Sequence, residues 1–198
     1  MQARKQNMSD QELVQKFLEG DQAAIEQLIN RHKDKVYTYI LLIVKNQQLA
    51  EDIFQDTFIK VIRSLLDGKY RENGRFASWV IRIAHNLIID HFRKEKQVNK
   101  YSNDDYESDI FNSKKFSGTN VEEYMVENQI TTDVRMLVDE LPEEQKQVIL
   151  LRHYGGLSFK EIAEQTNVSI NTALGRMRYA LINLRKIIER KNISLTAS

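Results

Sequence analysis

Hydrophobic residues recur every three or four positions along most of the chain, a spacing that predicts amphipathic helices. In the N-terminal half, a short helix is expected after Ser9 and a long one after Asp21, because both residues are favourable N-caps. Two further helices are predicted over about 48–66 and 76–96. This half therefore reads as a bundle of four helices.

The C-terminal third carries clearer start and stop signals. Pro142 opens one predicted helix, and two consecutive glycines at positions 155 and 156 end it. Ser158 and Glu161 have the spacing of a capping box, which predicts a short helix to about residue 165.

A sharp turn and a second helix follow directly. Asn167 suits the turn because asparagine tolerates a left-handed backbone, and Ser169 is a favourable cap for the helix that follows. A short helix, a tight turn and a longer helix describe a helix-turn-helix. We therefore predict an all-α fold, with two small helical domains joined by an acidic flexible linker.

Charge divides the chain in the same way. The formal net charge of +1 hides +4 in residues 1–100, −7 in residues 101–140 and +4 in residues 141–198. Basic lobes are one mark of a nucleic-acid partner, although a charge of this size is also common by chance. Residues 98–120 are polar, rich in serine and acidic residues and without a sustained period, which is typical of a linker.

Composition excludes several classes of protein. The chain has no cysteine, so disulfides and thiolate chemistry are ruled out, and this agrees with a cytoplasmic location. Its longest apolar run, residues 36–44, is shorter than the roughly 20 residues that a membrane-spanning helix needs. The four histidines lack ligand spacing and no phosphate loop is present, so we expect no enzyme activity, no cofactor and no metal site.

The helix after Ser169 has a polar face opposite its apolar stripe. In a helix-turn-helix the second helix enters the major groove of DNA, and this face is the candidate reading surface. The alternative interpretation is an ordinary solvated helix face, in which the glycine only lowers the stability of the helix. The candidate residues are Ser169, Asn171, Thr172, Gly175, Arg176, Arg178, Tyr179 and Lys186.

A cationic row lies along the predicted helix 76–96. Arg75, Arg82, Asn86 and Arg93 fall on one flank beside Trp79, an arrangement that suits a single nucleic-acid strand. Trp79 is more simply explained as a core residue, and Asp90 lies one turn from Arg93, so part of the row can be local ion pairing.

The predicted helix 48–66 carries a third polar face, with an isoleucine among acids and an amide. Such a surface can dock another protein, or it can be a solvated face with one stray hydrophobic residue. Its residues are Asp52, Gln55, Asp56, Ile59 and Arg63.

Four segments occur in the order typical of bacterial extracytoplasmic-function (ECF) sigma factors, and the chain resembles that family over about residues 10–97 and 121–187. These segments are GDQAAIEQLINRHKDKVY, AEDIFQDTFIKVI, FASWVIRIAHNLIIDHFRK and the stretch from LPEEQKQVILLRHYGG to RYALINLRK. The resemblance implies a region 2 domain over 1–97, a linker over 98–120 and a region 4 helix-turn-helix domain over 121–198.

The resemblance also implies a function: binding of core RNA polymerase and recognition of promoter DNA. Asp52, Gln55 and Asp56 match the motif that docks on the clamp helices of the largest polymerase subunit. In the family, the helix matching 76–96 reads and melts the −10 element, and the second domain reads the −35 element. Residues 82, 86, 90 and 93 match the frequent Arg, Asn, Asp, Arg pattern of that helix. By family habit an anti-sigma factor is a further expected partner.

The chain departs from the family pattern at two places, and two alternative functions are left open. Leu174 and Gly175 stand where lysine and serine are frequent, and Tyr179 stands where arginine is common, so we expect a −35 preference particular to this chain. The alternative function is a dimeric helix-turn-helix regulator that acts without polymerase, and this reading leaves the first-domain faces unexplained. A helical scaffold is a third reading, which predicts no salt-dependent affinity for DNA.

Overall fold

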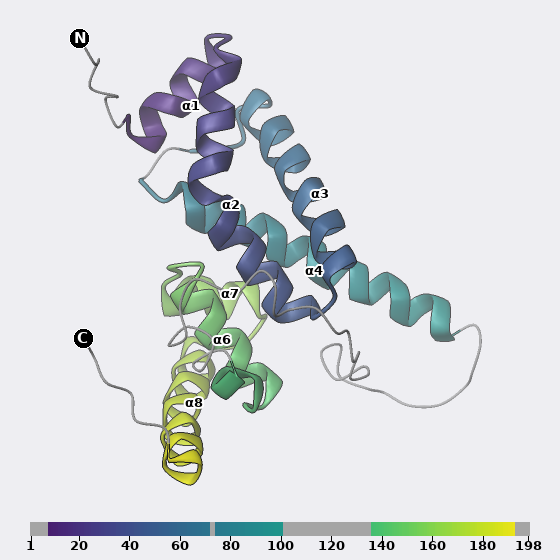
Figure 1. Cartoon of the computed structure of the whole chain (residues 1–198), viewed down its shortest axis with the longest axis vertical. Coiled ribbons are helices and arrows are strands. Elements are labelled where there is room, and N and C mark those ends of the chain that lie inside the picture. Colours follow the sequence, from purple (N-terminus) through teal and green to yellow (C-terminus); the bar gives the residue numbers. More distant parts are fainter. Residues whose placement is uncertain (1–7, 72–73, 101–135, 193–198) are drawn as a thin grey trace.

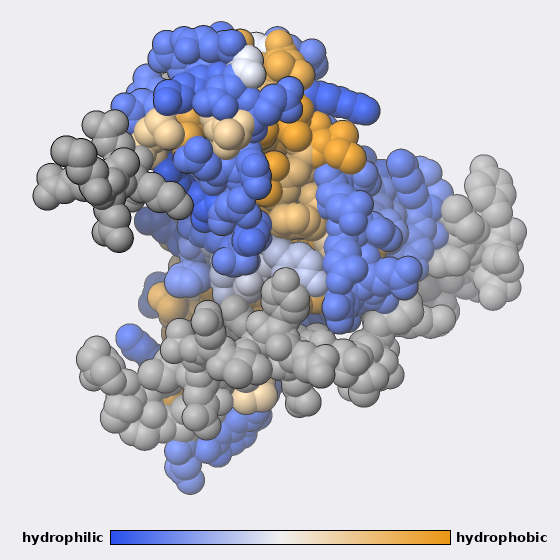
Figure 2. Space-filling view, turned by 45° about the horizontal axis from the view of Figure 1, so that its top comes forward, coloured by the Kyte–Doolittle hydropathy of each residue, from blue (hydrophilic) through white to orange (hydrophobic). Residues whose placement is uncertain are grey.

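The computed structural model describes residues 8–71, 74–100 and 136–192, and every regular element in these ranges is an α-helix. The helices form two lobes, with α1 to α4 in one and α6 to α8 in the other (Figure 1). On the face shown in Figure 2, hydrophilic residues cover most of the described surface, and hydrophobic residues gather in the first lobe. The described residues thus agree with the all-α prediction. Most of the predicted linker lies outside them.

The first lobe is built around α2, which contacts the other three helices of this lobe. Ser9 caps α1 through a complete capping box with Glu12, and Asp21 caps α2 by accepting the N–H of Ala23. Both predicted caps are confirmed. The helices are α1 (Asp10–Leu18), α2 (Gln22–Val44), α3 (Gln47–Leu66) and α4 (Phe76–Lys100).

The second lobe has the predicted helix-turn-helix. Ser158 and Glu161 form the capping box of α7, Asn167 has a left-handed backbone with φ of 54°, and the Ser169 side chain accepts the N–H of Thr172. Residues 136–139, ahead of α6, are also helical. The helices are α6 (Glu143–His153), α7 (Phe159–Gln165) and α8 (Ile170–Lys191).

One helix ends later than the sequence pattern predicts. α4 continues to Lys100 rather than Lys96, so residues 98–100 of the predicted linker are helical. This stretch does not contain the glycine or proline that would stop a helix. α8 continues to Lys191, and its end is set by the left-handed backbone of Asn192, a common helix terminator.

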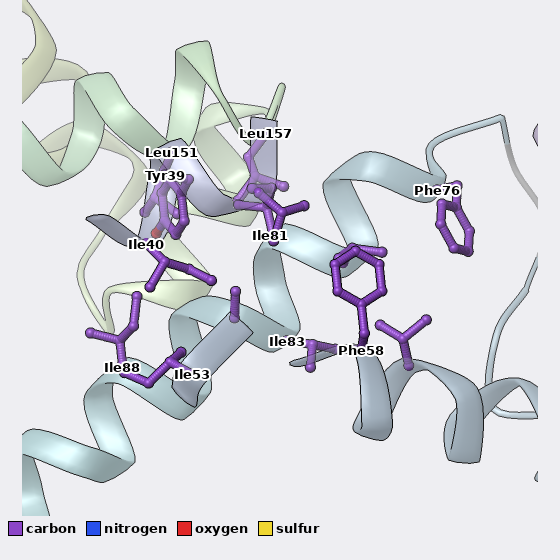
Figure 3. Close-up of a cluster of buried hydrophobic side chains, with 14 of the residues drawn as sticks. Tyr39, Ile40, Ile53, Phe58, Phe76, Ile81, Ile83, Ile88, Leu151 and Leu157 are labelled. Carbon is purple, nitrogen blue, oxygen red and sulfur yellow. The ribbon is translucent and has the colours of Figure 1, made fainter. Parts of the chain in front are cut away.

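The two lobes share one hydrophobic core. A single cluster of buried side chains includes Tyr39 and Ile81 of the first lobe and Leu151 and Leu157 of the second, each no more than 1% exposed. Figure 3 draws Ile81 beside Leu157 within this cluster. Gly155 lies at the same junction, where an added Cβ would be 3.3 Å from the Ile81 Cγ2 atom. The lobes are therefore held together by apolar burial.

α4 is buried on two faces rather than one. The apolar stripe that the sequence predicts, with Phe76, Val80 and Ala84, is buried in the first lobe. Ile81 and His85 are also fully buried, on a second face that meets the other lobe. This second face was not predicted, although the spacing of four residues between Ile81 and His85 is its sequence signal.

His85 links three helices at the junction. Its Nδ1 atom lies 2.7 Å from the Tyr39 hydroxyl on α2, and its Nε2 atom lies 3.3 Å from the side-chain amide of Gln147 on α6. A neutral imidazole can donate from one nitrogen and accept at the other, so it can satisfy both partners. Burial lowers the pKa of His85 from 6.5 to about 4 and keeps the ring neutral near pH 7.

This buried histidine predicts a loss of stability in acid. The unfolded chain binds a proton at His85 near pH 6.5, whereas the folded chain does so only near pH 4. The free energy of unfolding should therefore fall between these two pH values, by roughly 3 kcal/mol at most. Urea unfolding at a series of pH values measures it.

Two variants separate the contribution of His85 to this pH dependence from that of the carboxylates, which also titrate in acid. His85→Phe should be less stable at pH 7, because Tyr39 and Gln147 lose a buried partner, and should lose the histidine part of the slope. His153→Gln changes an exposed histidine and should keep the wild-type slope. An unchanged slope in His85→Phe would contradict the assignment.

Candidate nucleic-acid interface

α8 presents the predicted reading face to solvent. Ala173 and Ala180 are fully buried against the rest of the second lobe. On the other side of the helix, the exposed candidates are Ser169, Asn171, Thr172, Arg178, Tyr179 and Lys186. Tyr179 is 62% exposed, so its ring and hydroxyl are both available to a ligand.

Two candidates on α8 differ from this exposed set. Gly175 is partly covered, and an added Cβ would meet no atom within 4 Å, so packing among the described residues does not require glycine there. The Arg176 side chain is only 25% exposed and its guanidinium lies 4.0 Å from the Glu144 carboxylate on α6. Arg176 is thus tied to its own lobe at the edge of the face.

The cationic row on α4 meets the second lobe. The Arg75 guanidinium donates to the two carboxylate oxygens of Glu161 on α7, at 2.8 and 3.1 Å. Arg82 donates to the same carboxylate at 2.9 Å. One acidic side chain therefore holds two of the predicted −10 residues.

The charge on Glu161 is strongly favoured. Partial burial acts to raise the pKa of this carboxyl, but hydrogen bonds from the Ser158 backbone, Arg75 and the Ser158 hydroxyl, together with the Arg75 charge, lower the pKa to about 2. The Ser158 contacts are those of the capping box. A single residue thus caps α7 and forms ion pairs with α4.

The remaining residues of the row have different partners along α4. Gln165 at the end of α7 donates to the Asn86 side chain in a close contact. One turn further on, Arg93 lies 3.5 Å from Asp90, and both are exposed. The structure thus has the local ion pair that the sequence suggests. It leaves this end of the row outside the contact with α7.

Trp79 packs as a core residue would. It is half-buried, and its ring centroid lies 4.6 Å from that of Tyr70 and 5.7 Å from that of Phe76. This aromatic cluster supports the simpler interpretation of Trp79. Part of the Trp79 side chain stays accessible to solvent.

The candidate docking face on α3 is exposed as a whole. All five residues, Asp52, Gln55, Asp56, Ile59 and Arg63, are exposed. The opposite side of α3 buries Ile53, Val61 and Leu65 in the first lobe. Ile59 is 47% exposed, so the helix keeps an accessible apolar residue at the centre of an acidic face.

Sequence reasoning missed one residue of the α3 face. Leu66 is 63% exposed and lies two turns after Ile59, three residues after Arg63. Its position at i+7 from Ile59 was the available signal. It extends the apolar part of the face toward the end of α3.

Two features are absent from residues 8–71, 74–100 and 136–192. Within them, no group of three or more histidine, cysteine or acidic side chains is arranged to hold a metal ion. No helix there combines the length and the apolar character needed to cross a membrane.

Comparisons with known proteins agree with this geometry. Residues 28–98 match the family model described as Sigma-70 region 2, and residues 131–179 match the model described as Sigma-70, region 4. The first match contains the faces of α3 and α4, and the second contains α6, α7 and the first half of α8.

Similar curated proteins carry sigma-factor names. The ECF RNA polymerase sigma factor SigE of Mycolicibacterium smegmatis is 30% identical over 90% of this chain and 67% of its own length. The ECF RNA polymerase sigma factor SigW of Bacillus subtilis is 28% identical over 87% of this chain and 93% of its own.

Solved structures share the fold. CnrH, solved in complex with the cytosolic domain of CnrY, superposes with a TM-score of 0.56 at 20% identity, over 91% of this chain and 97% of that chain. RpoE of Bartonella quintana, solved with the anti-sigma factor NepR, gives a TM-score of 0.57 at 18% identity, over 83% and 96% of the two chains. With both regions matched in order and a relative aligned along most of its length, the chain belongs to the ECF RNA polymerase sigma factors.

Proposed function

We propose that this sigma factor docks on core RNA polymerase through the exposed face of α3, reads and opens the −10 element with α4, and reads the −35 element with α8. The observation that carries the proposal is the α3 face, which keeps Ile59 and Leu66 exposed among charged and amide side chains. A helix-turn-helix regulator that acts alone has no use for it. The regulator alternative is not favoured, since the first lobe matches sigma region 2.

The proposed roles are divided between the two lobes. We assign residues 1–97 to the region that contacts polymerase and the −10 element, residues 98–120 to an acidic linker, and residues 121–198 to the −35 reader. Asn171 and Arg178 on α8 have side chains that can read base edges, whereas Tyr179 and Lys186 suit phosphate contacts. Arg75, Arg82, Asn86 and Arg93 are assigned to the −10 strand, with Trp79 beside them and Asp90 orienting Arg93.

Regulation and location follow from the family. RpoE was solved in complex with an anti-sigma factor, and we assign this chain an anti-sigma partner of its own. We place the protein in the cytoplasm, where polymerase and promoter are found. It acts by binding and positioning rather than by catalysing a reaction, and needs no cofactor of its own.

Removal of the α3 face should weaken binding to core polymerase. In Asp56→Ala/Ile59→Ala we expect a loss of about tenfold or more, because an exposed apolar anchor and a neighbouring charge are removed together. Glu51→Ala, which removes an exposed carboxylate at the edge of this face two turns before Ile59, should bind nearly like the wild type. Titration of labelled core enzyme gives the affinity, and equal affinities in both variants would sink the docking assignment.

Arg178→Ala should reduce discrimination between −35 sequences by roughly fivefold to a hundredfold, the usual worth of one specific base contact. Binding to core enzyme should persist. Arg190→Ala is the matched control, because Arg190 lies on α8 but pairs with Glu140. Run-off transcription from a pool of genomic promoters tests this, and unchanged promoter choice in Arg178→Ala would count against the assignment.

Arg82→Ala should impair strand opening more than binding to duplex promoter, since the row is assigned to the melted strand. With core enzyme present, potassium permanganate reactivity of bubble thymines should fall several-fold while the closed complex still forms. Lys94→Ala removes an exposed cation at the edge of the row, more than three turns from Arg82, and should leave the bubble intact. If Arg82→Ala keeps the wild-type permanganate reactivity, the assignment of Arg82 to the −10 site is wrong.

A further inference from the structure

α8 carries exposed apolar side chains beside its polar reading face. Leu174 is 44% exposed, and Ile170, one turn earlier on the same side of the helix, is 46% exposed. Both residues lie in the first two turns of α8, which begins at Ile170. Exposure of apolar side chains to water is unfavourable, so a partner that covers them with an apolar group of its own gains free energy.

Leu174 lies between two residues that can read base edges. Asn171 precedes it by three positions and Arg178 follows it by four, so the three side chains share one side of the helix. Asn171 and Arg178 are both exposed, and neither side chain has a hydrogen-bonding or ion-pair partner in the part of the chain that the structure describes. A DNA duplex that binds Asn171 and Arg178 therefore also meets Leu174.

Gly175 permits a close approach at this point of the helix. It follows Leu174 directly and has no side chain, and an added Cβ would meet no described atom within 4 Å. The backbone of α8 can therefore come near to a partner there. This matters for Leu174, because a leucine side chain is shorter than that of an arginine and reaches a base only when the helix is close.

Double-stranded DNA presents one methyl group in its major groove. This is the 5-methyl group of thymine, whereas the other readable groups there are hydrogen-bond donors and acceptors. In a helix-turn-helix, the N-terminal part of the second helix faces these base edges. Leu174 lies in that part of α8, whereas Leu181, which is 51% exposed, lies about two turns further on.

We propose that Leu174 contacts the 5-methyl group of a thymine in the −35 element and makes recognition of that element thymine-specific at one position. The inference rests on the proposed function, which takes α8 as the −35 reader, and it names the group that one side chain recognises. Asn171 and Arg178 bind donors and acceptors on either side, and Leu174 binds an apolar group between them.

Uracil tests this contact, because it pairs as thymine does and lacks only the methyl group. The probe is the most active promoter from the genomic pool, with uracil in place of each −35 thymine in turn. It is bound as a duplex by the complex of the full chain with core polymerase. At one position we expect the affinity to fall about fourfold, the worth of one buried methyl group. A −35 element without thymine on either strand, or an affinity that no uracil changes, would overturn the inference.

Three variants assign the uracil effect to a residue. Leu174→Ala should bind the thymine promoter less tightly and show no uracil effect at that position, because the partner of the methyl group has been removed. Leu174→Met keeps a long apolar side chain and should retain the effect. Leu181→Ala removes another exposed leucine of α8 and should behave like the wild type. An undiminished uracil effect in Leu174→Ala would contradict the proposal.

Exchange of the −35 base pairs for other pairs distinguishes failure of this contact from failure of the −35 assignment. If exchange weakens binding and uracil does not, α8 still reads the −35 element and only the methyl contact is wrong. If neither changes binding, the −35 assignment fails as well. Weaker binding of Leu174→Ala to core polymerase, with an unchanged uracil effect, would show that Leu174 meets a protein partner and would also overturn the proposal.

Discussion

The structure depends on the burial of α4 along two faces. One face, with Phe76, Val80 and Ala84, completes the four-helix lobe. The other, with Ile81 and His85, forms the junction with the helix-turn-helix lobe. A helix buried on two sides keeps only a narrow strip outside its apolar contacts, and the arginine row lies on that strip, where α7 meets its first part. The arrangement of the whole molecule therefore determines how much of the row is available.

Polar groups decide how specific this junction is. Apolar burial alone is non-directional and tolerates sliding of one surface over another. His85 requires Tyr39 and Gln147 at defined positions, because a buried ring nitrogen without a partner would be costly. Glu161 adds a second constraint, because its one carboxylate accepts from two arginines about two turns apart. The register of the lobes is thus set by polar pairs around an apolar centre.

The three surfaces to which we assign a role differ in how much of each is exposed to solvent. The α3 face and most of the α8 face are exposed in the isolated chain, whereas α7 covers the first part of the α4 row. A surface that is free can make the first contact with a partner, and one that is covered has to wait for a rearrangement.

The sequence by itself determined the helices and which face of α3 and α8 stays in water. Local signals suffice for this, because a cap such as Ser158 and a turn residue such as Asn167 act within one turn, and amphipathic spacing acts within one helix. The residues of the α3 face were predicted with the exception of Leu66, whose exposure depends on how the end of the helix packs.

Only the tertiary structure decided what the arginine row meets. Arg75 and Glu161 are 86 positions apart, and no periodicity within α4 or α7 encodes their contact. The second buried face of α4 was likewise missed, since an isoleucine and a histidine on a helix become core residues only when another lobe covers them. Helix propensity and amphipathicity are local properties, whereas the pairing of two amphipathic surfaces depends on their shapes and charges in space.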